Sequence, residues 1–391
     1  MAYYDRIKTP RIFLENALTR QAVSFATLQQ SENWECAASR WGIQHLFACR
    51  VICKQPSDIL PLLADRVYPG CEDGLHECIN NLIQGPRDSA ATLKRMAEIQ
   101  IVHAYERESL GYVWAALAPL LKSERVDFHT STSERRVRER RQPERQDYVS
   151  SAGFQISSSP PDMADTASSA PSSIEYTEGP SAPLVEDYTV RFLSCLIRCV
   201  LNYSQPLTKS KPFIQYHDER LAYAFGTNTE KGFKAIDDGG VQIEQEENSQ
   251  VALVEAKRSF QDIRDGSPTV SDELLAQIVG EALAARVSKT ERVSENNIVS
   301  IVAVKYYIKF FHFSITEEFV HQFRTLAPTD ENPDMATYMQ LDSTGWFDMR
   351  GKAGRKYFVR HLLGLIGWAN DAVIKGNIQD LENLEDFMDT E

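Results

Sequence analysis

Apolar residues in the first third of the chain recur at the spacing of helix faces. They fall every three or four positions in Leu14–Ala22 and in Trp41–Cys53, which is the spacing of one face of an α-helix. Ile59–Val67 follows a helix-start signal, and Ser89–Leu121 alternates apolar positions with charged ones. Residues 1–125 are therefore predicted to form a helical accessory domain without strands.

The second half of the chain mixes strand signals with helix signals. Val251–Lys257 and Ile298–Val304 are short apolar runs rich in small and β-branched residues, which are typical of buried strands. Tyr306–Ile315 alternates polar and apolar residues and is predicted to be the next strand. Val185–Tyr203 and Ser271–Val287 repeat apolar residues at helical spacing. This order predicts an α/β (α+β) fold.

Between these parts the composition changes to Ser, Pro, Arg, Glu and Asp. Residues 126–183 hold few large apolar side chains whose burial could offset the entropy of ordering the chain, so we expect a disordered linker. Within it, Glu134–Arg145 carries six arginines among three glutamates. That run is either a nuclear-localisation or nucleic-acid tether, or a solvated charge run. We expect residues 184–378 to form the α/β core and residues 379–391 to form an acidic tail that is loosely ordered.

Composition narrows the class of protein. The chain has 391 residues of which 42% are hydrophobic, enough for at least one sizeable core. No apolar run of membrane-spanning length and no signal peptide is evident, so we expect no membrane partner and a nuclear or cytoplasmic location. The seven cysteines are an odd number and are expected to be free thiols. The net charge of −13 argues against a passive nucleic-acid coat but does not exclude a nuclease.

Candidate chemistry gathers around the strand Val251–Lys257. Asp237 and Asp238 precede it, and Glu255 and Lys257 lie near its end. Because side chains alternate along a strand, Glu255 and Lys257 share one face. A buried charge is costly unless it is paired or bound to a metal. The pattern therefore indicates either a salt bridge where the strand emerges into water or a chemical site.

An acid followed by Glu-x-Lys on a strand resembles the PD-(D/E)xK nuclease superfamily, and a helical region before the core resembles its fungal nuclease-like branch. The resemblance covers Val185–Val373. It implies a restriction-endonuclease-like mixed sheet flanked by helices and preceded by an all-α region. It also implies that Asp238 and Glu255 converge on Mg²⁺ or Mn²⁺, while Lys257 orients the attacking water or relays its proton.

The match departs from the family pattern at the first acid. Asp237 stands where the family has Pro, which leaves the choice between Asp237 and Asp238 open. The following pair Gly239-Gly240 favours Asp238, because glycine permits a tight turn and close approach of the backbone.

Three more acids or amides are implied by the resemblance. A Gln on the helix after the Glu-x-Lys strand often lies near the site in relatives, which makes Gln277 a candidate; otherwise Gln277 and Glu281, one turn apart, face water. A helix before the first strand often donates a further acid, so Glu186 is a candidate, with stabilisation of the helix dipole as the alternative. Glu219 is a comparable candidate.

Cations cluster around two glycines in Trp346–Arg360. We expect this cluster to grip a phosphate backbone, or else to balance the acidic surface. Its members are Arg350, Lys352, Arg355, Lys356 and Arg360.

These features together predict a Mg²⁺-dependent or Mn²⁺-dependent nuclease acting on DNA or RNA. Two alternatives stay open, because function does not follow from fold. The core could be a catalytically inactive nuclease-fold module that binds nucleic acid or protein in the nucleus or in a host cell. It could instead be a structural scaffold in which Glu255 and Lys257 form an exposed ion pair. A protein partner is expected at the N-terminal helical region.

Overall fold

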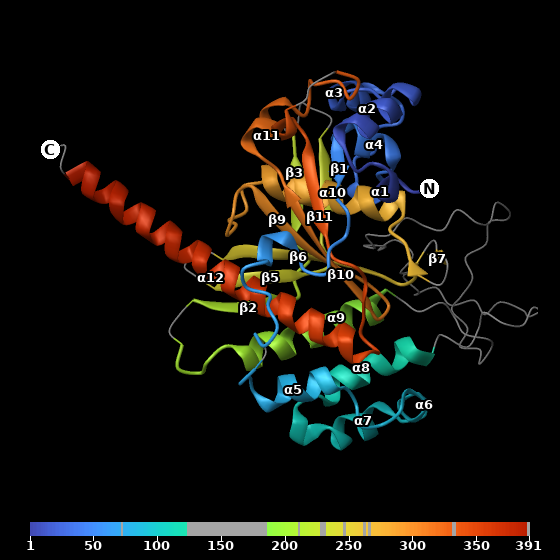
Figure 1. The fold of residues 1–391 in the computed structure, drawn as a ribbon, viewed down its shortest axis with the longest axis vertical. Coiled ribbons are helices and arrows are strands. Elements are labelled where there is room, and N and C mark those ends of the chain that lie inside the picture. Colours follow the sequence, from blue (N-terminus) through green and yellow to red (C-terminus); the bar gives the residue numbers. More distant parts are fainter. Residues whose placement is uncertain are drawn as a thin grey trace, which may run out of the picture.

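A mixed sheet of eight strands runs through the centre of the molecule in this computed structural model (Figure 1). The structure describes residues 1–71, 73–122, 186–209, 212–226, 232–244, 248–260, 263–264, 267–330 and 334–388. The strands of the sheet are β1 (Val51–Cys53), β2 (Phe213–His217), β5 (Gly240–Glu244), β6 (Ser249–Lys257), β9 (Asn297–Val304), β10 (Tyr307–Ser314), β11 (Met339–Ser343) and β12 (Phe347–Asp348).

The spatial order of these strands is β1-β11-β10-β9-β6-β5-β2, with β12 paired to β10. β6 runs parallel to β9, and β1 runs parallel to β11, whereas the other neighbours are antiparallel. Two small hairpins lie outside the sheet, namely β3 (Ala222–Phe225) with β4 (Phe233–Ile236), and β7 (Ile263–Arg264) with β8 (Ser267–Pro268).

Helices cover both faces of the sheet (Figure 1). Their bounds are α1 (Tyr3–Arg6), α2 (Pro10–Thr19), α3 (Phe25–Gln30), α4 (Ile43–Ala48), α5 (Glu77–Gln84), α6 (Ala90–Leu93), α7 (Glu98–Ala104), α8 (Gly111–Lys122), α9 (Asp187–Ser204), α10 (Asp272–Val287), α11 (Glu317–Gln322) and α12 (Lys352–Met388). The 3₁₀ turns in the described ranges are η1 (Ala38–Arg40), η2 (Pro61–Leu63), η3 (Glu106–Glu108) and η6 (Met335–Thr337).

Two apolar cores result, one on each face. On one face α9 packs against β2 and β6 and is backed by α5, α8 and α12. On the other face α10 packs against β9 and is surrounded by α1, α4 and η1. The alternation along β6 serves both cores, because Val254 points to the α9 side and Leu253 to the α10 side. Glu255 follows the same alternation and therefore points toward α10.

The predicted mixed α/β class is confirmed, as are the strongest periodic segments. Val185–Tyr203 forms α9 and Ser271–Val287 forms α10, while Val251–Lys257, Ile298–Val304 and Tyr306–Ile315 form β6, β9 and β10. The first turn of α10 is stabilised at its cap, where the Ser271 hydroxyl accepts the N–H of Leu274 at 3.1 Å. None of the helices in the described ranges is long and apolar enough to cross a bilayer.

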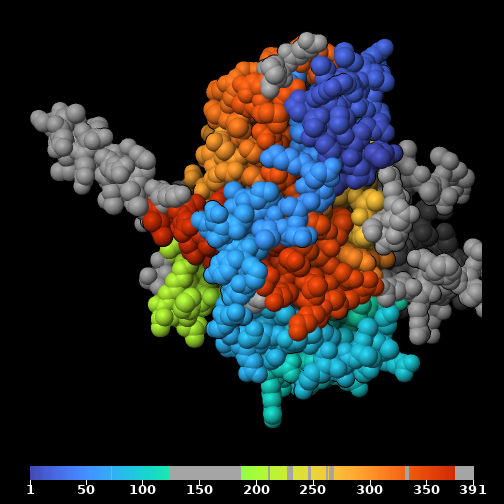
Figure 2. All heavy atoms as spheres, viewed as in Figure 1, coloured from blue at the N-terminus to red at the C-terminus, as the bar shows by residue number. Residues whose placement is uncertain are grey.

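The N-terminal residues do not form a separate all-α domain, which corrects the prediction for residues 1–125. β1 joins the central sheet, where Val51 pairs with Met339. Leu46 lies in the core on the α10 side and Trp114 in the core on the α9 side. Figure 2 shows the blue N-terminal surface lying directly against the red surface of α12. The N-terminal segment is thus an integral part of one fold.

The prediction that Trp41–Cys53 is a helix is only partly right, because its second half contains the strand β1. α4 ends at Ala48, and Arg50 adopts a left-handed conformation with φ of 50° that turns the chain into β1. The run Val51–Cys53 is fully buried in the sheet, an environment that suits β-branched side chains. Apolar residues at helical spacing can therefore belong to a helix followed by a buried strand.

Two other helix predictions were too long, and the tail that was predicted to be loose is mostly helical. Ser89–Leu121 is divided into α6, α7, η3 and α8. The left-handed φ of 57° at Ser109 accounts for the break between η3 and α8. Ile59–Val67 contains only the short turn η2. In contrast, α12 continues to Met388 through most of the predicted tail 379–391, which holds no Gly or Pro before that residue. The predicted linker 126–183, with its arginine run, lies outside the described residues.

Two cysteine thiols from separate segments meet in the core on the α9 side. Sγ of Cys78 on α5 lies 3.4 Å from Sγ of Cys199 on α9. A disulfide requires the sulfurs to close to about 2 Å, so a small side-chain movement suffices. We expect diamide to join these two cysteines, with the two thiol protons and two electrons passing to the oxidant.

The product of this oxidation is a covalent link between α5 and α9. Mass spectrometry of unreduced peptides should find that link in the wild type and in Cys71→Ser, but not in Cys78→Ser. Its absence in the wild type under conditions that oxidise other thiols of the chain would contradict the geometry.

Candidate metal centre

Asp238 lies opposite Glu255 because β5 pairs with β6. Gly240 pairs with Leu253 in antiparallel register, which places Asp238, just before β5, beside Glu255 on β6. The Asp238 N–H donates to the carbonyl of Val254 at 2.9 Å. In return, the Ala256 N–H donates to Asp238 Oδ2 at 3.1 Å. Backbone hydrogen bonds thus hold Asp238 at the end of the strand that carries the Glu-x-Lys sequence.

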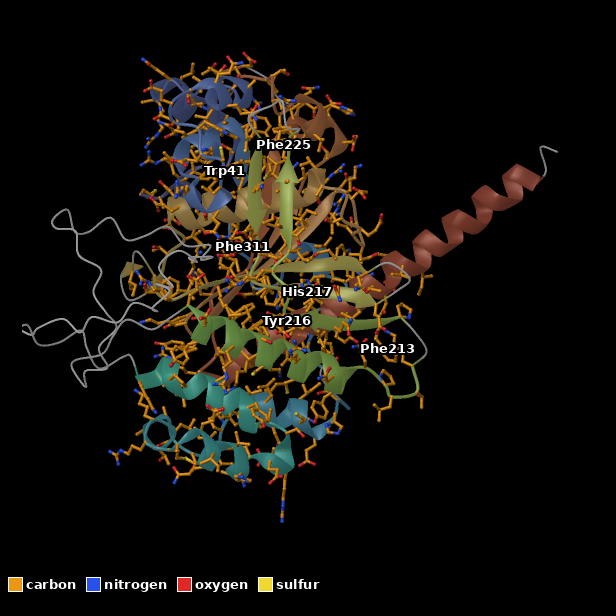
Figure 3. All side chains as sticks on the ribbon, turned by 180° about the vertical axis from the view of Figure 1, so that it is seen from behind. Trp41, Phe213, Tyr216, His217, Phe225 and Phe311 are labelled. Carbon is orange, nitrogen blue, oxygen red and sulfur yellow. The ribbon has the colours of Figure 1, made fainter. Side chains whose placement is uncertain are left out.

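The glycine pair permits a close approach between β5 and β2. Gly239 has a φ of +128°, and a Cβ there would lie 2.6 Å from the Tyr216 hydroxyl oxygen. A Cβ on Gly240 would lie 2.5 Å from His217 Nε2. Figure 3 shows Tyr216 and His217 side by side on β2. Any side chain at these two positions would push β5 away from its neighbour, so the glycines are needed to place Asp238.

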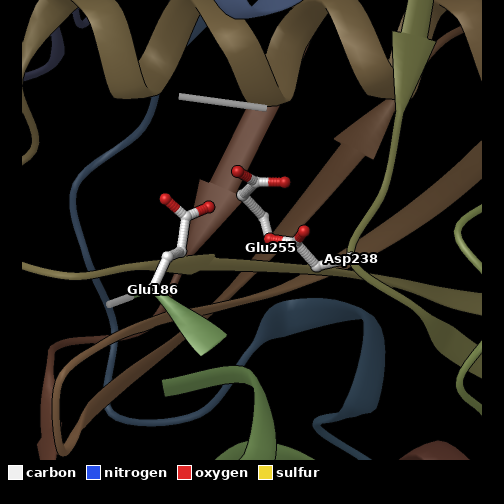
Figure 4. Close-up of side chains that lie close together, drawn as sticks. All are labelled: Glu186, Asp238 and Glu255. Atoms are coloured by element: carbon white, nitrogen blue, oxygen red, sulfur yellow. The ribbon is translucent and has the colours of Figure 1, made fainter. Parts of the chain in front are cut away.

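Three carboxylates converge at this point (Figure 4). One oxygen each of Glu186, Asp238 and Glu255 lies within 4.8 Å of the others. Oxygens bound to one Mg²⁺ lie up to about 4 Å apart, given metal–oxygen distances near 2.1 Å. The expected closeness of Asp238 and Glu255 is confirmed, and Glu186, which directly precedes α9, completes the trio. Glu219 is exposed and takes no part in it.

Lys257 lies beside these acids, on the same face of β6 as predicted. Its Nζ is 2.6 Å from Glu255 Oε1 and 4.0 Å from Glu186 Oε1. Burial acts to lower the pKa of Lys257, but the carboxylates of Glu255 and Glu186 outweigh burial, and the pKa is raised. The side chain therefore stays a protonated ammonium, which can donate hydrogen bonds but does not act as a base at neutral pH.

Gln277 reaches the same carboxylate from α10. Its Nε2 donates to Glu255 Oε1 at 2.7 Å and to Glu281 Oε1 at 2.8 Å. Both α10 side chains are almost fully buried, at 2% and 1% exposure, so the alternative that they face water is wrong. The resemblance placed Gln277 near the site, but Glu281 was not recognised as part of it. The available signal was the apolar surroundings of Glu281 on α10, where Ile278 and Ala282 are buried too.

The structure distinguishes Asp237 from Asp238. Asp237 accepts hydrogen bonds from the Leu221 N–H and from the Tyr223 hydroxyl, both at 2.8 Å, and so fixes the neighbouring loop. Burial raises the pKa of Asp237 to about 7. In Asp238, by contrast, Oδ1 accepts no hydrogen bond from the described residues and lies 3.4 Å from Arg220 Nη2. Asp238 is accordingly the acid available to a cation.

The site holds an excess of negative groups. The acids are Glu186, Asp238, Glu255 and Glu281, and the cations are Lys257 and Arg220. Burial, followed by the Glu255 carboxylate, raises the pKa of Asp238 to about 8. Burial likewise raises the pKa of Glu281 well above its ordinary range. Arg220 is also shared with Asp187, at 3.7 Å. A divalent cation would compensate negative charge that the lysine and the arginine leave unbalanced when these acids are ionised.

The predicted phosphate-binding cluster is only partly exposed. Arg355 is buried, and within the described part of the chain its guanidinium donates to four backbone carbonyls, those of Ile83, Gln84, Met349 and Arg350. The prediction that Arg355 binds nucleic acid is therefore wrong, because its donors are used inside the fold. Arg350 is paired with Asp348 at 2.7 Å and stacks on the Tyr306 ring at 4.3 Å. Lys352 is exposed, while Lys356 and Arg360 are half-buried.

Comparison of the chain with protein-family models, with curated proteins and with solved structures finds no match.

Proposed function

We propose that this chain is a metal-dependent phosphodiesterase of the PD-(D/E)xK type that hydrolyses DNA or RNA. The observation that carries the proposal is the convergence of Glu186, Asp238 and Glu255 within 4.8 Å, with the Lys257 ammonium 2.6 Å from Glu255. A hairpin that presents one acid opposite a Glu-x-Lys strand, followed by α10 and a parallel β9, also supports a restriction-endonuclease-like fold.

The donor set fits a hard divalent cation. Carboxylate oxygens are the ligands that Mg²⁺ and Mn²⁺ favour, and one or two carboxylates plus substrate phosphate suffice for Mg²⁺. In the proposed site Asp238 and Glu255 would hold the ion, with Glu186 as a further acid beside it. The bound ion would lower the pKa of a coordinated water and polarise the phosphoryl group.

The neighbouring side chains have separate roles in the proposed reaction. Because the raised pKa keeps Lys257 protonated, its ammonium orients the attacking water and donates to the developing charge on a phosphate oxygen. Gln277 donates to Glu255 Oε1 and so fixes the rotation of that carboxylate. We propose Lys352, Lys356 and Arg360 as contacts to the substrate backbone, with Arg350 as a further contact if its pair with Asp348 opens.

A second function is supported by the ion pairs already present. Arg220 lies 3.4 Å from Asp238, and Lys257 lies 2.6 Å from Glu255, so part of the negative charge is balanced without a metal. A binding module that has lost catalysis could keep such a network for stability alone. The two functions differ in whether Arg220 gives way to a cation at Asp238, which metal titration decides.

The affinity for Mn²⁺ is expected to rise with pH up to about 8. In the metal-free protein the pKa of Asp238 is raised to about 8, so at neutral pH a cation must displace its proton. Below that pKa, affinity falls by up to about tenfold per pH unit for one displaced proton, and above it the affinity levels off. Calorimetric titration with Mn²⁺ in two buffers of different ionisation enthalpy measures both affinity and proton release.

The matched control for this titration is Asp238→Asn, which keeps the shape of the side chain but carries no titrating proton. Its binding should be weak and should release no proton from that position. A wild-type affinity that does not change between about pH 6 and pH 9 would show that Asp238 is not a ligand.

A further inference from the structure

Glu281 is a buried acid, and burying its carboxyl group costs free energy of folding. It lies in the middle of α10 with 1% of its surface exposed, between Gly280 and Ala282. Its Oε2 accepts no hydrogen bond from any residue that the structure describes. A buried carboxylate with an unsatisfied oxygen destabilises a fold, and an apolar residue of similar size would pack there more favourably. The acid therefore needs a reason other than packing.

The contact of Glu281 with Gln277 provides that reason. The two residues are one helical turn apart, and Gln277 Nε2 lies 2.8 Å from Glu281 Oε1 and 2.7 Å from Glu255 Oε1. An amide nitrogen only donates, and a carboxyl oxygen that carries no proton only accepts, whether or not the other oxygen of that group is protonated. Two acceptors on either side of one nitrogen use both of its hydrogens. Glu281 thus prevents the Gln277 amide from flipping its oxygen toward Glu255.

The orientation of Gln277 in turn decides the orientation of Glu255. Glu255 Oε1 receives the Gln277 N–H and also faces the Lys257 ammonium at 2.6 Å. Two donors to the same oxygen fix the rotation of the Glu255 carboxylate about its Cγ–Cδ bond. A flipped amide would place its own oxygen against that carboxylate and repel it. Metal ligands held by outer hydrogen-bond partners bind their ions more tightly.

We infer that Glu281 is a positioning residue of the metal centre, acting through Gln277 to hold the Glu255 carboxylate in the orientation that receives the divalent cation. This inference depends on the proposed function, since it assigns a residue to the same site. It makes Glu281 necessary for tight metal binding although Glu281 does not touch the metal.

Two substitutions separate positioning from packing. Glu281→Gln keeps an oxygen that can accept the Gln277 N–H, whereas Glu281→Met keeps the approximate volume and removes the acceptor. In calorimetric titrations with Mn²⁺, Glu281→Met should bind about 10- to 100-fold more weakly than the wild type, and Glu281→Gln should stay within about threefold of it. Both should melt at or above the wild-type temperature without metal, because a buried acid has been removed.

A double-substitution cycle tests the route of the effect with a variant that removes the acceptor. If Glu281 acts through Gln277, the pair Gln277→Met with Glu281→Met should bind Mn²⁺ no more weakly than Gln277→Met alone. If Glu281→Met fails to fold, Glu281→Leu, which also removes the acceptor, takes its place in the titration and in the cycle. Losses that simply add would overturn the inference.

The outcomes also distinguish this inference from the proposed function. A folded Glu281→Met protein that binds Mn²⁺ as the wild type does overturns the positioning role and leaves the metal site standing. Equal losses in Glu281→Gln and Glu281→Met overturn it too, because charge rather than an acceptor for Gln277 would then be required. A wild-type protein that binds no Mn²⁺ overturns the proposed metal site and the role of Glu281 together.

Discussion

The Lys257→Met variant is expected to lose about 10²- to 10³-fold in the rate of metal-dependent nucleic-acid cleavage, with its affinity for nucleic acid nearly unchanged. Nζ of Lys257 is 2.6 Å from Glu255 Oε1 and lies beside the carboxylate trio. Its donor therefore acts where charge develops during phosphodiester hydrolysis. Backbone contacts supply most of the affinity for nucleic acid, and these are proposed at other cations. The measurement is the single-turnover rate on labelled single-stranded and double-stranded DNA and RNA with Mg²⁺ or Mn²⁺.

Lys305→Met is the matched control for this experiment. Lys305 follows β9, and its N–H donates to the carbonyl of Lys257 at 3.2 Å, so the same change of side chain is made next to the site without touching the acids. Its cleavage rate should match the wild type, and chelation of the metal should abolish both activities. If the wild-type protein cuts none of the substrates with either metal, the catalytic proposal is wrong and a binding module takes its place.

Arg355→Met is expected to lower the free energy of unfolding by about 3–5 kcal/mol, because several buried carbonyl acceptors are left without a donor at a cost of about 1–3 kcal/mol each. The Arg355 guanidinium donates at 2.7–3.2 Å to the carbonyls of Ile83 and Gln84 at the end of α5, and of Met349 and Arg350 before α12. Without it, four carbonyls lose their donors. A Cβ on Gly85 would lie 2.3 Å from the guanidinium, so that junction is closely packed. Urea denaturation gives the change in free energy.

Lys352→Met tests the same segment at an exposed position. Its free energy of unfolding should stay within about 0.5 kcal/mol of the wild type, while its affinity for nucleic acid should fall and depend less on salt. The converse result, a stable Arg355→Met protein with reduced affinity for nucleic acid, would mean that Arg355 leaves its carbonyl partners to bind a phosphate.

The parts of the fold that could be predicted from the sequence are those whose signal is local. β6, β9 and β10 are long enough for strand patterning to appear within each segment, and α9 and α10 carry helical repeats. β1 could not be predicted, because a strand of three residues shows no period. What makes Val51–Cys53 a strand is its pairing with Met339–Leu341, a contact between distant parts of the chain that no sequence window contains.

In the candidate site, too, the residues with a local sequence signal could be predicted and those placed by long-range packing could not. The spacing of Asp238, Glu255 and Lys257 was visible because all three belong to one hairpin, and their closeness follows from its register. Glu281 was missed because α10 is buried on all sides, so helical periodicity gives no reason to place one polar residue inside and another outside. Arg355 and Lys352 look alike in sequence, and only the packing of α5 against α12 separates them.

The pairing of β1 with β11 also sets an order of events during protein synthesis. Val51 leaves the ribosome long before its partner Met339 has been made, so the first strand must wait while most of the chain is translated. During that interval the apolar side chains of α1–α4 have no completed sheet to cover them, and an unpaired strand edge is open to other chains. We therefore expect molecular chaperones to bind the nascent N-terminal segment until β11 has been synthesised.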